Sequence, residues 1–420
     1  MREMKDSGIE WIGNIPASWK SVPMRYLFRE CTTKNRLGQE KTALKFTYGT
    51  IIPKKNFNAN TDDYVANTIM SYTVVHPGVI MINCLNLNYD FVSQRIGLVK
   101  DYGAITSAYL AIEPNSQVLS AYATYQLKSW DAAKAFHNMG TGVRKTLDFS
   151  ELGKKHFVLP TLGEQKNIVE FLDSQCSEID AISADIQKEI EILEQYKRSV
   201  ITEAVTKGLN PDVEMKDSGI QWIGNIPAHW DVIRGKYILR YMQKPVREDD
   251  GVITCFRDGE VTLRSNRRED GFTMSDKEIG YQGIDVGDLV VHGMDGFAGS
   301  IGISDSRGKA SPVLNVLETD QNKRYIMYYL RSMAYSDVFL ALATGIRVRS
   351  CDLRWNKLAD LSYPVPPLDE QKAIVEHIDA VLAKADAVIS DKKAQLATLD
   401  EYKKSLIFEY VTGKKEVPLS

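Results

Sequence analysis

The chain has 420 residues, of which 44% are hydrophobic and 25% are charged, and its formal net charge is −3. This balance is typical of globular proteins and excludes a fibrous or disordered chain, while the length predicts two or three domains. A net charge so close to zero also excludes a uniformly basic nucleic-acid-binding protein.

The cysteines, histidines and hydropathy exclude further classes. The five cysteines lie far apart with no CxxC pair, and the six histidines form no HExxH motif, so we predict neither a disulfide framework nor a metal site. No run approaches eighteen apolar residues, and the first residues lack the apolar core of a secretion signal. We therefore expect a cytoplasmic protein with no membrane partner.

The first segment of the chain is repeated about half-way along the sequence. Residues 4–19 read MKDSGIEWIGNIPASW and residues 215–230 read MKDSGIQWIGNIPAHW, with fourteen of sixteen positions identical. A second block recurs in the same way, as TLGEQKNIVEFLD at 161–173 and PLDEQKAIVEHID at 367–379. The chain is therefore one unit of about 205 residues written twice, with similar ends and a diverged middle.

The diverged stretches, about 20–160 and 231–363, are predicted to be mixed α/β globular domains. Short β-branched and aromatic runs at 71–83 and 285–293 indicate strands ended by turns. Each stretch closes with a helical segment, at 121–138 and 323–343. We predict an α/β (α+β) fold in four parts: a globular domain over 1–160, a long helix over 161–210, a second globular domain over 211–363, and a long helix over 364–420.

The long helices carry apolar residues in steps of three and four, which is typical of a coiled-coil seam. We predict that they pack on each other as an antiparallel pair related by a pseudo-twofold axis, although two unrelated surface helices are the alternative. One polar residue, Lys392, interrupts the seam, and the sequence suggests no acidic partner for it. The residues expected at the seam are Ile179, Ile182, Ile186, Leu193, Val388, Leu396, Leu399 and Leu406.

The acidic charge lies on the helices, so the globular parts are mildly basic. Residues 161–207 contain ten acidic and five basic side chains, and residues 368–415 contain nine and eight, which leaves +3 for the remainder. Basic clusters can grip phosphates or guanine, and Asn can read adenine, although solvated surface is the alternative for each cluster. The candidate DNA contacts are Lys34, Arg36, Lys54, Lys55, Asn56, Arg95, Arg144, Lys145, Arg264, Asn266, Arg267, Arg268, Arg307, Lys309, Arg347 and Arg349.

No catalytic constellation stands out from the sequence. Residues 210–213 read NPDV and do not match the Asn/Asp-Pro-Pro-aromatic motif of adenine methyltransferases. Residues 302–309 imitate a phosphate-binding loop, but Ala310 follows where Ser or Thr would hold magnesium. We therefore predict a non-catalytic chain without a cofactor of its own.

The repeated set resembles the specificity subunits of Type I restriction-modification systems over the whole chain. The resemblance rests on SGIEWIGNIPASW, on LPTLGEQKNIVEFLD and on the long helix that follows, all of them duplicated. The first copy has Thr161 where the pattern expects a second proline. The resemblance implies two target-recognition domains on two antiparallel helices, each reading one half of a split, asymmetric site in double-stranded DNA.

The resemblance also implies partners that carry the chemistry. Two methyltransferase subunits would use S-adenosylmethionine to modify adenines, and restriction (translocase-nuclease) subunits would use ATP and magnesium. Three other classes are alternatives: a DNA-binding regulator of the same plan, a restriction enzyme with its own active site, and a scaffold that never contacts DNA.

The duplication predicts where the first segment packs. The second copy of the segment follows the end of the first helix directly, whereas no helix precedes the first copy. We therefore expect residues 4–19 to dock at the end of the second helix, around residues 410–413, and a circular permutant to fold. The tryptophans of both segments, Trp11, Trp19, Trp222 and Trp230, are expected to be packing anchors of these junctions.

Overall fold

The computed structural model describes residues 2–55, 68–89, 94–143, 145–267, 279–342 and 353–418. Five of the candidate DNA contacts lie outside these ranges, namely Asn56, Arg144, Arg268, Arg347 and Arg349. The chain divides into two compact units, residues 1–186 with 394–420 and residues 187–393, and each long helix contributes a half to both. Each unit is described by itself.

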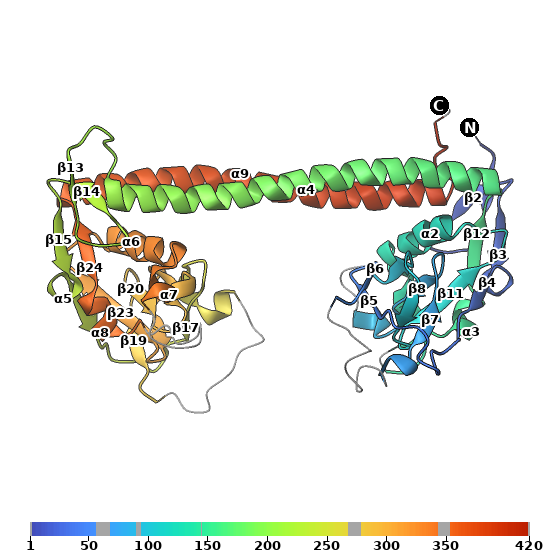
Figure 1. The fold of residues 1–420 in the computed structure, drawn as a ribbon, viewed down its shortest axis with the longest axis horizontal. Helices are drawn as coiled ribbons and strands as arrows, with labels where there is room; N and C mark the ends of the chain where they lie inside the picture. The colour runs from blue at the N-terminus through green and yellow to red at the C-terminus, as the bar shows by residue number, and fades with distance from the viewer. Residues whose placement is uncertain are drawn as a thin grey trace. The chain divides into compact units, whose positions relative to one another are not determined.

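The first unit is built around a four-stranded antiparallel sheet in the order β4–β11–β8–β9 (Figure 1). Helix α2 packs against β9 and β11, and smaller strand pairs (β1–β2, β3–β12, β5–β6 and β7–β10) surround the sheet. The bounds are β1 Met4–Asp6, β2 Asn14–Pro16, β3 Lys20–Pro23, β4 Phe28–Glu30, β5 Leu44–Thr47, β6 Thr50–Pro53, β7 Thr73–Val75, β8 Ile80–Ile82, β9 Ile96–Leu98, β10 Gly103–Ile105, β11 Leu110–Pro114, α2 Ser120–Ala132, α3 Phe149–Leu152, β12 His156–Leu159 and α4 Leu162–Lys207.

The second unit repeats this topology strand for strand. Its sheet has the order β16–β23–β20–β21, helix α6 takes the place of α2, and the smaller pairs are β13–β14, β15–β24, β17–β18 and β19–β22. The bounds are β13 Met215–Asp217, β14 Asn225–Pro227, β15 Asp231–Arg234, α5 Gly235–Ile238, β16 Leu239–Met242, β17 Ile253–Cys255, β18 Val261–Leu263, β19 Gln282–Ile284, β20 Leu289–His292, β21 Ile301–Ile303, β22 Gly308–Ala310, β23 Leu314–Thr319, α6 Lys323–Tyr335, α7 Val338–Ala341, α8 Trp355–Asp360, β24 Ser362–Val365 and α9 Leu368–Val411.

A buried tyrosine fixes each globular core to the end of a long helix. In the first unit the Tyr122 hydroxyl, on α2, donates to the carbonyl oxygens of Val158 and Val411. In the second unit the Tyr325 hydroxyl, on α6, makes the equivalent bonds to Val205 and Pro364. Because an unpaired buried hydroxyl is costly, these bonds hold α2 and α6 in one place against the helix ends.

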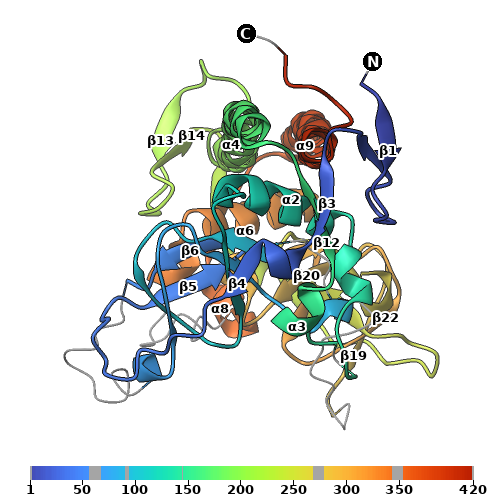
Figure 2. The ribbon, with the colours of Figure 1, turned by 90° about the vertical axis from the view of Figure 1, so that its right-hand side faces the viewer.

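Helices α4 and α9 pack side by side (Figure 2), and the contacts of Ile179 with Leu406 and of Lys197 with Asp386 fit an antiparallel pair. In the first unit Ile179 of α4 shares a buried cluster with Leu406 of α9. The other buried or half-buried seam residues follow strict 4-3 steps: Ser183, Ile186, Ile190, Leu193 and Lys197 on α4, and Ala385, Ile389, Lys392, Leu396, Leu399 and Lys403 on α9. This heptad spacing confirms the predicted coiled-coil packing.

Two of the predicted seam residues were wrong. Ile182 is 50% exposed and Val388 is 43% exposed, whereas Ile190 and Ile389 are buried. The heptad step from Ile179 lands on Ser183, so Ile182 points outward despite its apolar side chain.

The seam also has ion pairs that sequence periodicity did not reveal. Lys392 pairs with Glu189, which supplies the acidic partner that the sequence had left unidentified. Two further pairs are related by the repeat: Lys197 with Asp386 at 2.5 Å and Lys403 with Asp180 at 2.6 Å. The lysine stems cover the seam while their ammonium groups reach its edge.

The junction predicted for residues 4–19 is confirmed. Gly413, just beyond α9, lies so close to Pro16 and Trp19 that an added Cβ would come within 2.5 Å and 2.9 Å of them. The Trp19 indole is 1% exposed and donates to Glu164 at 2.9 Å.

The second copy repeats this junction at Gly208, which lies against Trp230, and the Trp230 indole donates to Glu370 at 3.1 Å. Trp11 packs edge-on against Trp130, with 5.5 Å between ring centroids. Trp222 departs from the expectation, since it stays 38% exposed.

Candidate nucleic-acid interface

The candidate contacts of the first unit gather beside the β5–β6 hairpin. The Lys54 ammonium, directly after β6, lies 3.4 Å from the Tyr72 hydroxyl and 5.5 Å from its ring centroid. The Lys34 ammonium lies 3.4 Å from Thr73 Oγ1, on the next residue along. Arg36 and Lys55 are exposed nearby in sequence. The structure therefore brings Lys34 and Lys54 together although twenty residues separate them.

Two other candidates in this unit are held by the backbone. Arg95 is 6% exposed, and its guanidinium donates to the carbonyl oxygens of Asn83, Leu85 and Asn86. It therefore braces that loop and is not accessible to DNA, contrary to its selection as a contact. Lys145 is half-buried and donates to the His137 carbonyl oxygen at 3.1 Å.

The candidates of the second unit gather beside the equivalent hairpin, β17–β18. Arg264 Nε donates to Thr254 Oγ1 at 3.3 Å, and Asn266 donates to Thr262 Oγ1 at 2.8 Å, so both side chains lie against the hairpin. Arg267 pairs with Asp258 and Glu260 and its guanidinium stacks over Phe256, at 4.2 Å from the ring centroid. Arg264 follows β18 as Lys54 follows β6.

Arg307 belongs to a partly exposed ion-pair network. Its guanidinium makes two hydrogen bonds of 2.9 Å to Asp250 and one to Asp285, and Lys244 pairs with Asp285 and Asp288. The hydrogen bonds from Arg307 lower the pKa of Asp250 to about 2. The neighbouring Lys309 is half-buried on β22. The network ties β19 and β22 to the loop at residue 250, so Arg307 has a structural role, and its selection as a DNA contact stays a prediction.

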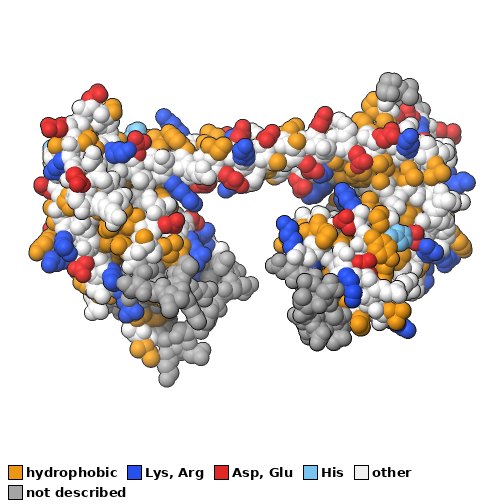
Figure 3. Space-filling model, in the orientation of Figure 1, with side chains coloured by type: hydrophobic (Ala, Val, Ile, Leu, Met, Phe, Trp, Pro, Cys, Tyr) orange, Lys and Arg blue, Asp and Glu red, His pale blue; other side chains and the backbone are white. Residues whose placement is uncertain are grey.

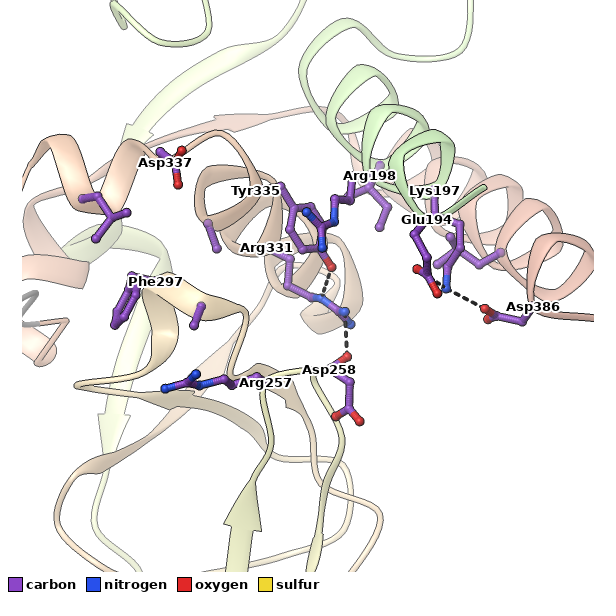
Figure 4. Close-up of a pocket in the computed structure, with 15 residues that line it drawn as sticks. Glu194, Lys197, Arg198, Arg257, Asp258, Phe297, Arg331, Tyr335, Asp337 and Asp386 are labelled. Carbon is purple, nitrogen blue, oxygen red and sulfur yellow. Dashed lines mark hydrogen bonds and ion pairs between the residues drawn. The ribbon is translucent and has the colours of Figure 1, made fainter. Parts of the chain in front are cut away.

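Each unit has a groove where its hairpin tip, its α2 or α6 helix, and the long helices meet. In the second unit the groove has a volume of about 660 Å³, and Figure 4 shows Arg198 and Arg331 beside Tyr335. Their guanidinium carbons lie 5.3 Å and 5.7 Å from the Tyr335 ring centroid. Arg331 also donates to the Tyr335 hydroxyl at 2.8 Å and to the Asp258 carbonyl oxygen at 2.7 Å.

The groove of the first unit has a volume of about 520 Å³ and lies at the equivalent place. It is lined by Tyr48 at the hairpin tip, by Lys128 on α2, and by Lys403 and Lys404 on α9. The side chain of Lys128 is accessible, but desolvation of its ammonium and the positive charge of Lys403 lower the pKa of Lys128. Lys128 and Arg331 occupy matching positions of α2 and α6.

Comparisons with known proteins decide the family. No protein-family model matches the chain. The chain is 24% identical over 333 residues to the Type I restriction enzyme MjaVIII specificity subunit of Methanocaldococcus jannaschii, which covers 75% of each chain. It is 21% identical over 428 residues to the Type I restriction enzyme StySPI specificity subunit of Salmonella potsdam, which covers 96% of this chain and 90% of that one. The chain belongs to the Type I restriction enzyme specificity subunits.

A solved structure shares the fold of this specificity subunit. It concerns complex assembly and conformational transition of the type I R-M system, and a chain in it matches with a TM-score of 0.66 at 14% identity, covering 96% of this chain and 99% of that chain. The predicted α+β fold with two long packed helices is thereby confirmed. As a specificity subunit, the chain is itself non-catalytic.

The side chains that line the two grooves were missed by the sequence reasoning. Lys128, Arg198 and Arg331 lie on helices and outside the basic clusters, so they did not stand out locally. The repeat carried a usable signal, because Lys128 and Arg331 lie in matching stretches, 122–129 and 325–332. Figure 3 shows basic side chains on the surface of both globular parts and many acidic ones along the helices.

The described ranges also lack metal-binding clusters and membrane-spanning helices. They contain no group of three or more His, Cys, Asp or Glu side chains that could hold a metal ion. Within the same ranges, no helix of the specificity subunit has the length and apolar content needed to cross a membrane.

Proposed function

We propose that this specificity subunit reads a split DNA sequence, one half with each repeat, while the paired helices carry the partner subunits. The globular parts, residues 1–160 and 211–363, would be the two target-recognition domains. The helices would set the separation of the half-sites, as the linkage between two DNA-binding modules does in dimeric DNA-binding proteins. The reading side chains would be those beside the β5–β6 and β17–β18 hairpins.

The observation that carries this proposal is that the two units share one topology but differ at their hairpins. Lys54 follows β6 beside Tyr72, whereas Arg264 and Asn266 follow β18 beside threonines. Arg prefers guanine edges, Asn prefers adenine, and Lys binds either guanine or phosphate. Reading two different half-sites requires different hydrogen-bond donors at equivalent positions of the two domains.

The helices support binding of two copies of one partner. Ile182 and Tyr402 of the first unit are 50% and 52% exposed, and Val388 and Tyr196 of the second unit are 43% and 50% exposed. These residues match pairwise through the repeat, Ile182 with Val388 and Tyr196 with Tyr402. Exposed apolar side chains on a coiled-coil surface favour a protein partner, and a matched set in each unit favours two identical ones.

We propose that these partners are two methyltransferase subunits and that restriction (translocase-nuclease) subunits join the same assembly. The methyltransferases would supply S-adenosylmethionine chemistry on flipped adenines, and the restriction subunits would use ATP and magnesium. The assembly would act on double-stranded DNA in the cytoplasm. The specificity subunit itself would contribute recognition and geometry only.

Methylation mapping tests the proposal directly. Genomic DNA is compared between cells that express the methyltransferase with this chain and cells that express the methyltransferase alone. Modified adenines should appear only with the chain and within one split, asymmetric motif. Unchanged methylation, or methylation of a single undivided motif, would refute the proposal.

Paired variants assign the half-sites. A Lys34→Ala, Lys54→Ala variant should relax one half-site and leave the other unchanged, and an Arg264→Ala, Asn266→Ala variant should do the reverse. A good base contact discriminates by about 1–3 kcal/mol. If both double variants relaxed the same half-site, the assignment of one domain to each half would be wrong.

A further inference from the structure

The two grooves recur at the same place in both units although the surrounding sequence has diverged. Each lies between a hairpin tip, α2 or α6, and a long helix. Three cationic positions are retained in both copies: Lys128 and Arg331, Lys403 and Lys197, and Lys404 and Arg198.

Acidic and basic side chains line each groove in equal number, three of each in the first unit and four of each in the second, but not every cation is ion-paired. Asp180 pairs with Lys403 at 2.6 Å, and its counterpart Asp386 pairs with Lys197 at 2.5 Å. Lys404 is paired with Asp400 at 2.7 Å. The third position, on α2 and α6, has no such partner, since neither Lys128 nor Arg331 forms an ion pair with a carboxylate within the described ranges.

The second groove contains a further arginine that lacks an ion pair with a carboxylate in the described ranges. Arg198, on α4, forms no ion pair with a carboxylate within the part of the chain that the structure describes, and its guanidinium stacks on the Tyr335 ring. Arg331 stacks on the same ring at 5.7 Å. Stacking on an aromatic ring orients a guanidinium. Arg331 donates through Nε to the Tyr335 hydroxyl and through Nη2 to the Asp258 carbonyl oxygen, so its remaining N–H groups would donate to an oxyanion. Four carboxylates line the same groove, but within the described ranges neither arginine forms an ion pair with any of them.

From these contacts we infer that each groove binds one backbone phosphate of the DNA, through Lys128 in the first unit and through Arg331 with Arg198 in the second. The inference rests on the proposed function and adds to it a contact that carries no sequence information. Phosphate contacts fix the register of a protein on the duplex, while base contacts specify the sequence. The two phosphate contacts would therefore hold the DNA beside the β5–β6 and β17–β18 hairpins, next to the long helices.

The ligand chemistry follows from the residue types. A phosphate oxygen accepts charge-assisted hydrogen bonds from guanidinium and ammonium groups, which are about twice as strong as neutral ones. A bound phosphate would also stabilise the Lys128 ammonium, which lies close to the like charge of Lys403. The two volumes, about 660 and 520 Å³, leave room for a backbone phosphate with its sugar.

The test measures salt-dependent binding by the full chain together with its methyltransferase. Two labelled duplexes are used, one with the mapped motif and one without it, between 50 and 200 mM salt. The variants are Lys128→Gln and Arg331→Gln. Each substitution should reduce the steepness of log K against log salt by about 0.9. Between the two salt concentrations, the affinity of each variant should therefore fall about three- to fourfold less than that of the wild type. The loss of affinity at low salt should be the same on both duplexes.

Matched control variants separate the groove from general charge. Arg29→Gln and Arg240→Gln remove exposed, repeat-related arginines that pair with Glu113 and Asp320 away from the grooves. They should leave the slope unchanged. The charge-preserving variants Lys128→Arg and Arg331→Lys should retain the wild-type slope, even if Arg331→Lys lowers thermal stability by losing the bonds to Tyr335 and Asp258.

Three outcomes would overturn the inference. The first is a salt slope that stays unchanged in both glutamine variants, and the second is a loss of affinity confined to the motif-bearing duplex. The third is a salt slope that falls as much in Arg331→Lys as in Arg331→Gln. The last outcome would make the groove a structural joint only. A wild-type complex that shows no preference for a split motif would instead refute the proposed function, so the two failures are distinguishable.

Discussion

Two equivalent glycines give a sharp prediction about the junctions. Gly413 and Gly208 each follow a long helix and have positive φ, +71° and +75°. An alanine in this left-handed region costs about 1–2 kcal/mol at either position. The surroundings differ, because a Cβ on Gly413 would lie 2.5 Å from the rigid Pro16 ring, whereas a Cβ on Gly208 would lie 3.2 Å from Glu370 and Trp230. Forcing the first contact apart adds about 1–3 kcal/mol.

We therefore expect Gly413→Ala to open its junction far more often than Gly208→Ala opens the other. Hydrogen exchange measured by mass spectrometry on residues 2–19 and 215–230 reports each opening separately, which a single melting curve of a two-unit chain does not. The extra 1–3 kcal/mol corresponds to roughly five- to 140-fold faster exchange in residues 2–19 of Gly413→Ala. Equal acceleration of the two segments in the two variants would refute the reasoning, as would full protection of residues 2–19 in Gly413→Ala.

Three further outcomes are expected. Inserting one heptad into each long helix should lengthen the spacer of the methylated motif by about three base pairs without changing either half-site. The reason is that seven residues add about 10 Å to each helix and keep the seam in phase. Methylation mapping measures the spacer, and an altered half-site would contradict the prediction. Ile190→Ala should lower the free energy of unfolding by about 2–4 kcal/mol and Ile182→Ala by less than about 0.5 kcal/mol, because only the former side chain is buried; equal losses in urea unfolding would place the seam elsewhere. The pKa of Asp250 is lowered to about 2 by Arg307, so its contribution to stability is present above about pH 4 and is lost as the pH falls toward 2; Asp250→Asn should be less stable than wild type at pH 7 and equal to it in acid, and a stability difference independent of pH would rule this out.

The amino-acid sequence by itself determined the plan of the molecule. The duplicated segments indicate a twofold repeat, and the long runs of three- and four-residue spacing indicate paired helices. The position of the first segment also followed, since the second copy shows what its ends must contact. These inferences succeed because repeats and periodicity are local properties of a chain and do not depend on knowing which residues meet in space.

Only the tertiary structure decided which individual side chains do what. Arg95 and Arg307 look like surface bases in the sequence, yet one is buried against backbone carbonyls and the other is held by two aspartates. Ile182 looks like a seam residue, but the heptad phase places Ser183 there. Lys128 and Arg331 belong to no basic cluster and yet line the two grooves. Burial, pairing and helix phase depend on partners far away in the chain, so spacing along the sequence could not assign them.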